Sequence, residues 1–316
     1  MKTAEDFGIQ GEPPSHPDLL DWLAVKFTTI DDGRSTMERQ GVKVATAAEL
    51  PNRTVAHYRP SSTVNRQGLG WSIKKLIRLI VTSATYRQSS RVTPELLEKD
   101  PDNRLLARGP RYRWPSFVLR DQALDLSELL VEKLGGPPVK PYQPEGVWED
   151  FSYGKIKYEQ DHGEGLYRRT LYTFWRRSVA PTTLFDTAAR RVCTVRTTRT
   201  NTPLQSLTML NDVTYVEASR KLAERMMKEG GRTPEGRIGF AFRLAAGRRA
   251  TQRELNLLNN SYTRYLARYR SDIESAKKLM SVGESKADPS LDTSELAAYS
   301  AVASLILNLD EVISKT

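Results

Sequence analysis

Apolar residues recur three and four positions apart along most of this chain, which is the spacing of one face of an α-helix. The segments LLDWLAVKF (19–27) and WSIKKLIRLI (71–80) show the pattern clearly, so we expect two amphipathic helices that pack together. The pattern continues to the apolar stretch AYSAVASLILNL (298–309), which we expect to be a core helix. The expected helices span residues 17–27, 72–82, 115–134, 203–210, 213–229, 234–246, 252–270 and 294–308.

Several helix starts are marked by a threonine or aspartate that directly precedes proline. The first residue caps the helix, and proline suits the first helical position because its missing N–H has no intrahelical partner there. Thr251 and Glu254 have the spacing of a capping box ahead of another helix. The pairs are Thr93-Pro94, Asp100-Pro101, Thr202-Pro203 and Thr233-Pro234.

Three segments depart from the helical pattern. Residues 28–70 have few large apolar residues and many Gly, Ser, Thr, Asn and Arg residues, which predicts a flexible, disordered insertion. Residues 135–165 begin with GGPPVKPYQPEG and are expected to form a Pro/Gly-rich connecting segment. Residues 166–177 fit both a helix and a strand, and we favour the helix. We predict a mainly α protein, an irregular multi-helix domain with long loops that forms one domain over residues 1–316.

Composition excludes several classes of protein. The mean hydropathy is −0.53 and no apolar run approaches 18 residues, so we expect no membrane-spanning segment. The N-terminal segment lacks the apolar core of a signal peptide, and we expect no secretory signal within this chain. Cys193 is the only cysteine, which excludes an internal disulfide, a multi-cysteine zinc site and c-type haem attachment. The histidines His16, His57 and His162 are too few for a histidine-rich metal site, so we expect no metal.

The chain is basic, with a net charge of +10, and many of its arginines lie in two segments. Residues 104–120 contain five arginines, and residues 165–200 contain eight with Asp186 as the only acid. Neither segment contains lysine. The planar guanidinium binds carboxylate, phosphate or sulfate through two parallel hydrogen bonds and tolerates partial burial, so we expect these arginines to have defined partners.

The first candidate site lies in CTVRTTRTNTPLQSL (193–207), where two arginines precede a helix start. Both guanidinium groups are expected to converge on one anion with the first N–H groups of the helix, because a helix N-terminus favours negative charge. The anion is either an internal carboxylate, such as that of Asp186 or Asp212, or an external phosphate, sulfate or carboxylate, and we favour the internal one. The candidate anion-binding residues are Arg196, Arg199, Thr202, which caps the helix, Leu204 and Gln205.

The second candidate site is the acidic cluster in YEQDHGEG (158–165), which consists of Glu159, Asp161, His162 and Glu164. Carboxylates act as a pair in glycoside hydrolysis when a cleft holds them roughly 5–10 Å apart. Their close spacing within a loop instead favours a solvated, salt-bridging segment. Catalysis by this cluster is therefore the alternative hypothesis.

Six ordered segments carry a further signal: DFGIQGEPPSHPDLLDWLAVKF, LIVTSATYRQSS, DNRLLARGPRYR, YRRTLYTFWRR, RTNTPLQSLTMLND and FRLAAGRRATQRELNLL. Together they resemble an uncharacterised planctomycete C-terminal domain family. In that family the domain closes large proteins that are predicted to be exported, downstream of a c-type cytochrome domain and a second uncharacterised domain. The resemblance covers nearly the whole chain apart from residues 28–70.

The resemblance implies an exported or cell-surface full-length protein, with haem in the upstream domain and no cofactor in this chain. It brings no established activity with it. We predict a non-catalytic binding or assembly module with an arginine-rich anion-binding surface, whose partners are the neighbouring domains and acidic polysaccharide. A carbohydrate-active or other hydrolytic enzyme that uses the acidic cluster is the alternative. Nucleic-acid binding is the weakest hypothesis, since no recognised nucleic-acid fold or basic helix is present.

Overall fold

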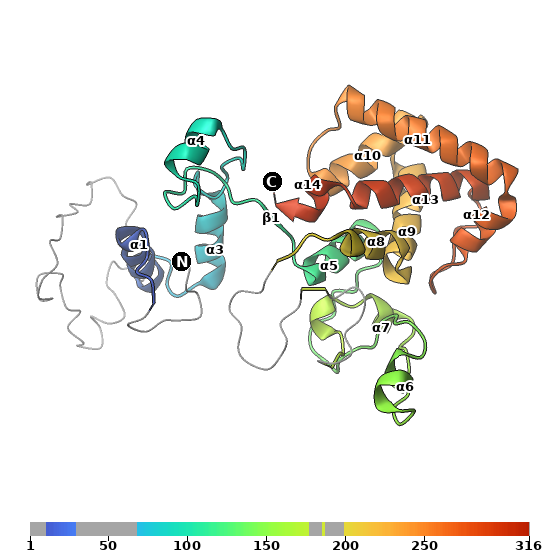
Figure 1. Cartoon of the computed structure of the whole chain (residues 1–316), viewed down its shortest axis with the longest axis horizontal. Helices are drawn as coiled ribbons and strands as arrows, with labels where there is room; N and C mark the ends of the chain where they lie inside the picture. Colours follow the sequence, from blue (N-terminus) through green and yellow to red (C-terminus); the bar gives the residue numbers. More distant parts are fainter. Residues whose placement is uncertain (1–10, 30–67, 177–184, 187–198, 316) are drawn as a thin grey trace, which may run out of the picture. The chain divides into compact units, whose positions relative to one another are not determined.

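The computed structural model describes residues 11–29, 68–176, 185–186 and 199–315. The chain divides into two compact units, Met1–Pro110 and Arg111–Thr316. The prediction of a mainly helical protein is confirmed, because helices dominate the described residues and the named strands form one two-stranded sheet (Figure 1). None of the helices described is both long and apolar enough to cross a membrane. The predicted insertion over 28–70 lies almost wholly outside the described residues, and the single-domain organisation stays a prediction.

The described helices of the first unit are α1 (Pro17–Thr28), α3 (Ile73–Thr82) and α4 (Pro94–Lys99). The Trp71 N–H donates to the carbonyl of Phe27 at 2.9 Å, and their rings meet edge-on with centroids 5.2 Å apart. These contacts join the end of α1 to the start of α3. Within the described residues of this unit no apolar side chain is buried.

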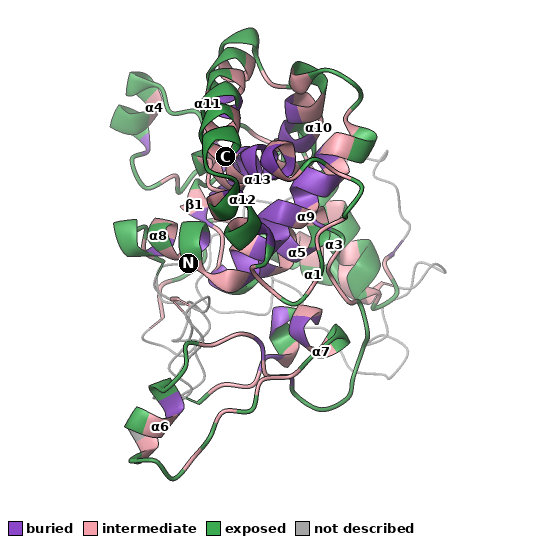
Figure 2. Cartoon of the chain, turned by 90° about the vertical axis from the view of Figure 1, so that its right-hand side faces the viewer, coloured by how far each residue is buried: buried purple, intermediate pink, exposed green. Residues whose placement is uncertain are grey.

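The second unit is a helical bundle centred on α9 (Val213–Glu229) and α13 (Thr293–Leu307). Figure 2 shows buried positions concentrated on these helices. The alanine-rich sequence of α13 is apolar on nearly every side, as expected of a helix that neighbours surround. The surrounding helices are α5 (Ser116–Leu126), α8 (Pro203–Asn211), α10 (Pro234–Ala246), α11 (Gln252–Ser271), α12 (Ile273–Met280) and α14 (Asp310–Ile313).

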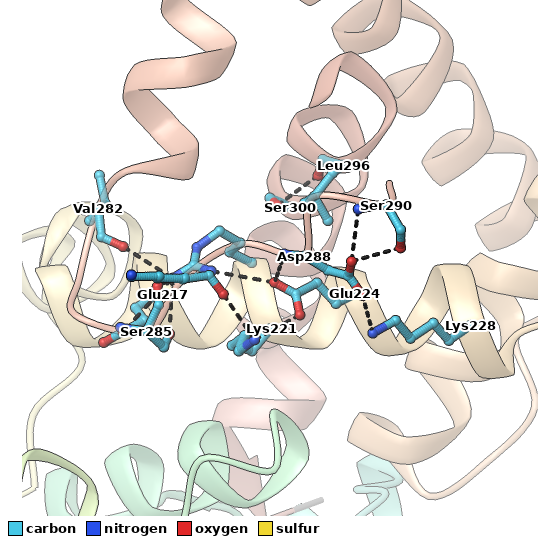
Figure 3. A network of polar contacts seen from close by, with 12 residues as sticks. Glu217, Lys221, Glu224, Lys228, Val282, Ser285, Asp288, Ser290, Leu296 and Ser300 are labelled. Atoms are coloured by element: carbon cyan, nitrogen blue, oxygen red, sulfur yellow. Dashed lines mark hydrogen bonds and ion pairs between the residues drawn. The ribbon is translucent and has the colours of Figure 1, made fainter. Parts of the chain in front are cut away.

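A buried charged network fastens the loop between α12 and α13 to α9 (Figure 3). The Arg220 guanidinium on α9 donates to the carbonyls of Val282 and Ser285 and to a carboxylate oxygen of Glu224 at 3.3 Å. Glu217 accepts the N–H of Ser285 at 2.7 Å. The network therefore satisfies loop groups that the helices leave without partners.

The expected helix over 115–134 is wrong at its C-terminal end, because α5 stops at Leu126. The Ser127 hydroxyl donates to the Leu124 carbonyl at 2.9 Å, and Glu128 adopts a φ of 59°. The following residues leave the helix axis, and the N–H of Val131 donates to the carbonyl of Tyr167 at 3.0 Å. Pairing with a distant segment thus replaces the continuation of the helix.

The favoured helix over 166–177 is also wrong. The segment contains the end of α7 (Glu164–Tyr167), a short 3-10 helix η2 (Thr170–Tyr172) and then extended backbone that pairs with Val139. The carbonyls of Leu166 and Arg168 accept hydrogen bonds from the Arg120 guanidinium, at 2.7 and 3.0 Å. A side chain thus satisfies acceptors that a continuous helix would pair with its own N–H groups.

Two further elements complete the second unit. The strand β1 (Tyr112–Arg113) pairs antiparallel with β2 (Ser314–Lys315) near the chain end. The short helix α6 (Val147–Ser152) lies within the connecting segment 135–165, where no helix was expected.

The capping box that opens α11 leads to a pH-dependent prediction. Glu254 accepts the Thr251 N–H at 2.7 Å and pairs with Arg248 at 2.6 Å, and these bonds, led by that to Arg248, lower the pKa of Glu254 to about 2. A lowered folded-state pKa stabilises the fold above the unfolded pKa of 4.5, and this stabilisation is lost as the pH falls towards 2. Glu254→Gln is therefore expected to lower the free energy of unfolding at pH 6.5, with a smaller difference from wild type at pH 3. Urea unfolding at both pH values measures this, and an equal difference at both would contradict it.

Candidate binding site

The described arginines of the two arginine-rich segments include several that turn inward. Arg120 is 1% exposed and donates to the carbonyls of Leu166 and Arg168 and to the Thr170 hydroxyl. Burial away from water lowers the pKa of the Arg120 guanidinium. Arg168 is also buried, donates to the carbonyls of Lys133, Gly135 and Pro137, and stacks on the Tyr172 ring at 3.9 Å. Arg120 and Arg168 have defined partners, as expected, but these partners are mainly backbone carbonyls rather than carboxylates.

At the helix start that was predicted as an anion site, side chains of the chain itself bond to one another. Thr202 caps α8 in a capping box with Gln205, whose N–H donates to the Thr202 hydroxyl at 3.4 Å. The Gln205 side chain donates to Asp186 at 3.1 Å, and Asp186 also accepts the N–H of Thr200 at 2.8 Å. An internal carboxylate therefore lies beside this helix start.

Of the two arginines predicted to bind the anion, Arg199 contacts an aromatic ring. The Arg199 guanidinium lies 3.9 Å from the centroid of the Tyr112 ring, and the Leu204 side chain is exposed. Arg196 lies outside the described residues, so its convergence with Arg199 stays a prediction. Arg113 instead reaches the polar groups of the helix start, because it donates to the Gln205 side-chain oxygen and to Asn201 at 3.1 Å.

The acidic cluster makes separate contacts. The Asp161 carboxylate accepts the N–H of Lys140 at 2.7 Å. His162 Nδ1 lies 2.6 Å from a carboxylate oxygen of Glu284, whose other oxygen accepts the N–H of Gly163 at 2.6 Å. These two bonds, first that to Gly163, hold the pKa of Glu284 below its usual value. The cluster thus ties its loop to neighbouring segments.

The remaining two acidic residues of the cluster lie towards solvent. Glu159 is exposed, and the Glu164 carboxylate is 4.0 Å from the Lys133 ammonium. Among the described residues no group of three or more His, Cys, Asp or Glu side chains is arranged to hold a metal ion.

A pocket of about 570 Å³ opens in the second unit where the α8–α9 junction faces the connecting segment. Its volume lies within the range of roughly 300–1,000 Å³ that small-molecule sites occupy. Its walls combine carboxamides, carboxylates, a hydroxyl, an aromatic ring and aliphatic side chains. The lining residues are Tyr142, Gln143, Pro144, Glu145, Gln160, Leu207, Thr208, Asn211, Asp212 and Val213.

A family model, PSD1, which is described as a protein of unknown function (DUF1553), matches residues 1–42 and 64–262. The chain belongs to this family. No curated protein and no solved structure matches the chain. The PSD1 match omits residues 43–63, which lie inside the segment 28–70, and it includes every residue that lines the pocket.

The sequence did not predict this pocket, although Gln160 lies within the segment 158–165 and Leu207 and Thr208 follow the predicted anion site. The segments that form it are separated by tens of residues, and none of them carries a motif. Asp212 is the lining residue with a recognisable local role, because it caps α9 by accepting the N–H of Thr214 at 3.0 Å. A helix cap does not by itself indicate a pocket.

Proposed function

We propose that the chain is a non-catalytic binding and assembly module of a larger protein, in which a neighbouring domain completes its first unit. The observation that carries this proposal is the exposed apolar surface of α3. Ile73 and Ile77 are 65% and 53% exposed, and Ile80 and Val81 are also exposed. Large exposed apolar patches mark interaction sites, and a helix of 10 residues gains most of its stability from packing.

The charge around α3 suggests the chemistry of its partner. Lys74, Lys75 and Arg78 are exposed on this helix, which carries no acidic residue. The whole segment 50–94 also lacks Asp and Glu. A partner surface with an apolar groove and a rim of carboxylates fits this arrangement, because complementary charge guides association and fixes orientation. The cations of the segment are Arg53, Arg59, Arg66, Lys74, Lys75, Arg78, Arg87 and Arg91.

The double variant Ile73→Ser/Ile77→Ser tests this proposal. Burial of one such side chain contributes about 1.5–3 kcal/mol, so the double variant is expected to bind the neighbouring domain at least 100-fold more weakly. Titration of the chain with that domain by calorimetry, over a series of salt concentrations, measures the affinity. Wild-type binding should weaken as salt rises.

The control is Leu134→Ser/Leu171→Ser, which removes two aliphatic side chains from the second unit that are even more exposed than the isoleucines, at 83% and 79%. It is expected to leave the affinity unchanged. Equal affinity of the wild type and the isoleucine variant, or no binding of the domain at low salt, would refute the assembly proposal.

The contacts of the described carboxylates support binding over hydrolysis. The Asp161 carboxylate accepts the N–H of Lys140, and Glu159 is exposed and does not line the pocket. The alternative, a carbohydrate-active or other hydrolytic enzyme that uses the 159–164 cluster, would need these side chains to face one another across a cleft.

The anion-binding surface in this proposal uses exposed arginines. Arg176 and Arg199 are exposed, whereas Arg113, Arg120 and Arg168 are buried among carbonyls and amides. Acidic polysaccharide is the external partner that such a surface would take. Binding to it would be weakened by salt, as for any surface charge interaction.

The cellular context of the proposal comes from the family resemblance. On that resemblance we infer that the full-length protein is exported or held at the cell surface, with haem in an upstream domain. The residues of this chain do not fit a c-type haem, because covalent attachment needs a pair of cysteines and Cys193 is the only one.

A further inference from the structure

We propose that the pocket at the α8–α9 junction binds an uncharged saccharide. This site is independent of the assembly surface on α3, since all its lining residues belong to the second unit. Three properties of the pocket wall point to this ligand class: the hydrogen-bonding groups, the charge and the apolar surface.

The carboxamides of the wall offer donors and acceptors in fixed places. The side-chain oxygen of Gln143 accepts the indole N–H of Trp148 at 2.5 Å, which fixes the orientation of the amide. The Gln143 amide nitrogen is buried and has no hydrogen-bond partner among the described residues. Asn211 donates to the Leu207 carbonyl at 2.8 Å, which leaves its side-chain oxygen as an acceptor.

A hydroxyl group both donates and accepts, so it suits a wall of this kind better than a group with one role. Thr208 adds a hydroxyl that already donates to the Leu204 carbonyl at 2.9 Å and can still accept. Gln160 contributes a further amide to the lining. A ligand with several hydroxyl groups can therefore pair with each of these side chains.

The charge of the pocket disfavours an anionic ligand. Glu145 and Asp212 are the carboxylic acids of the lining, and among the described residues no Lys, Arg or His side chain lines it. The negative charge of Asp212 is partly balanced by the N-terminus of α9, which it caps. An acidic polysaccharide would meet like charge here, so this pocket and the proposed anion-binding surface take different ligands.

The apolar part of the wall supplies contact area for the C–H faces of a sugar ring. Tyr142, Pro144, Leu207 and Val213 form this part. The Tyr142 hydroxyl accepts the N–H of Glu284 at 2.7 Å, which holds the aromatic ring in position. An amphipathic wall of aromatic and aliphatic side chains with a few fixed polar groups is typical of small-molecule sites.

The test is a titration of the intact chain with a panel of neutral α- and β-linked oligosaccharides, followed by ligand-observed NMR and calorimetry. Sulfated and amine-bearing oligosaccharides of the same length form the other two arms. We expect at least one neutral oligosaccharide to bind, and Asn211→Ala and Gln160→Ala each to weaken that binding about tenfold or more.

Gln252→Ala is the matched control, because Gln252 is an exposed amide on α11 that does not line the pocket, and it is expected to bind as the wild type does. Circular dichroism melting of each variant checks that it is folded. The proposal is overturned if no neutral oligosaccharide binds, if only the charged probes bind, or if the pocket variants bind as well as Gln252→Ala. None of these outcomes bears on the α3 surface, so this site and the assembly proposal can fail separately.

Discussion

Arg120→Met is expected to lower the free energy of unfolding of the chain by about 3–5 kcal/mol. The substitution keeps much of the side-chain volume but removes donors to the Leu166 and Arg168 carbonyls and to the Thr170 hydroxyl. Each buried acceptor left without a donor costs about 1–3 kcal/mol, and relief of the buried charge offsets part of the sum. Urea unfolding followed by circular dichroism measures the effect.

The control for this prediction is Arg169→Ala. Arg169 is adjacent to the same backbone, but its side chain is 52% exposed and pairs with Asp121 at 3.3 Å. Exposed pairs of this kind contribute about 0–1 kcal/mol, so the control should lie close to wild type. A loss below about 1.5 kcal/mol in Arg120→Met would mean that water or a backbone shift satisfies the carbonyls instead.

Helix starts were predictable from the sequence because their determinants are local. Thr93, Thr202 and Thr233 each cap a helix whose first residue is the following proline. Asp100 also precedes a proline, yet no helix follows it, because its carboxylate accepts the N–H groups of Arg104 and Leu105 in a turn. The same residue type thus serves a cap or a turn, and only its neighbours decide between them.

Helix ends and the pocket were harder to predict because their determinants are distant in sequence. α5 ends at Leu126, and Val131 beyond it pairs with the distant Tyr167. The expected helix over 166–177 is interrupted because Arg120 donates to the carbonyls of Leu166 and Arg168. The arginine pattern predicted defined partners, and Arg169 does pair with the Asp121 carboxylate. It did not predict that the buried Arg120 and Arg168 would donate mainly to backbone carbonyls, because guanidinium groups bind carboxylates and carbonyls alike. The pocket joins segments near residues 143, 160 and 211, and no periodicity within one of them reveals the others.

The charged network on α9 shows the same dependence on distant groups (Figure 3). Glu217, Arg220 and Glu224 lie on one face of that helix, where an apolar face would be the ordinary expectation. All three are buried. They bind the loop after α12, which contributes the N–H groups of Ser285 and Asp288. The helix pattern therefore predicted α9 correctly, whereas the polar composition of its buried face depends on the loop.

Arg220→Met is expected to destabilise the chain by about 3–5 kcal/mol, because it leaves the buried Glu217 carboxylate without its cation, whereas Glu224 keeps Lys221 at 2.7 Å. Arg220 is fully buried, 3.3 Å from Glu224 and 3.8 Å from Glu217, and one oxygen of Glu217 already has no hydrogen-bond partner among the described residues. Adding Glu217→Gln to Arg220→Met removes the stranded charge, so the double variant is expected to recover about 1 kcal/mol or more.

The two single variants and the double variant form a cycle that urea unfolding can measure at pH 7. Lys228→Ala is the control, since Lys228 pairs with Asp288 at 2.6 Å from a half-exposed position on the same helix, and it should cost about 1 kcal/mol or less. If the effects of Arg220→Met and Glu217→Gln simply add, the two groups do not interact energetically, and each contributes to stability through its own separate hydrogen bonds to the loop. Recovery in the double variant would instead show that Arg220 and Glu217 stabilise the fold through their mutual interaction, because only an interaction between the two groups makes their effects non-additive.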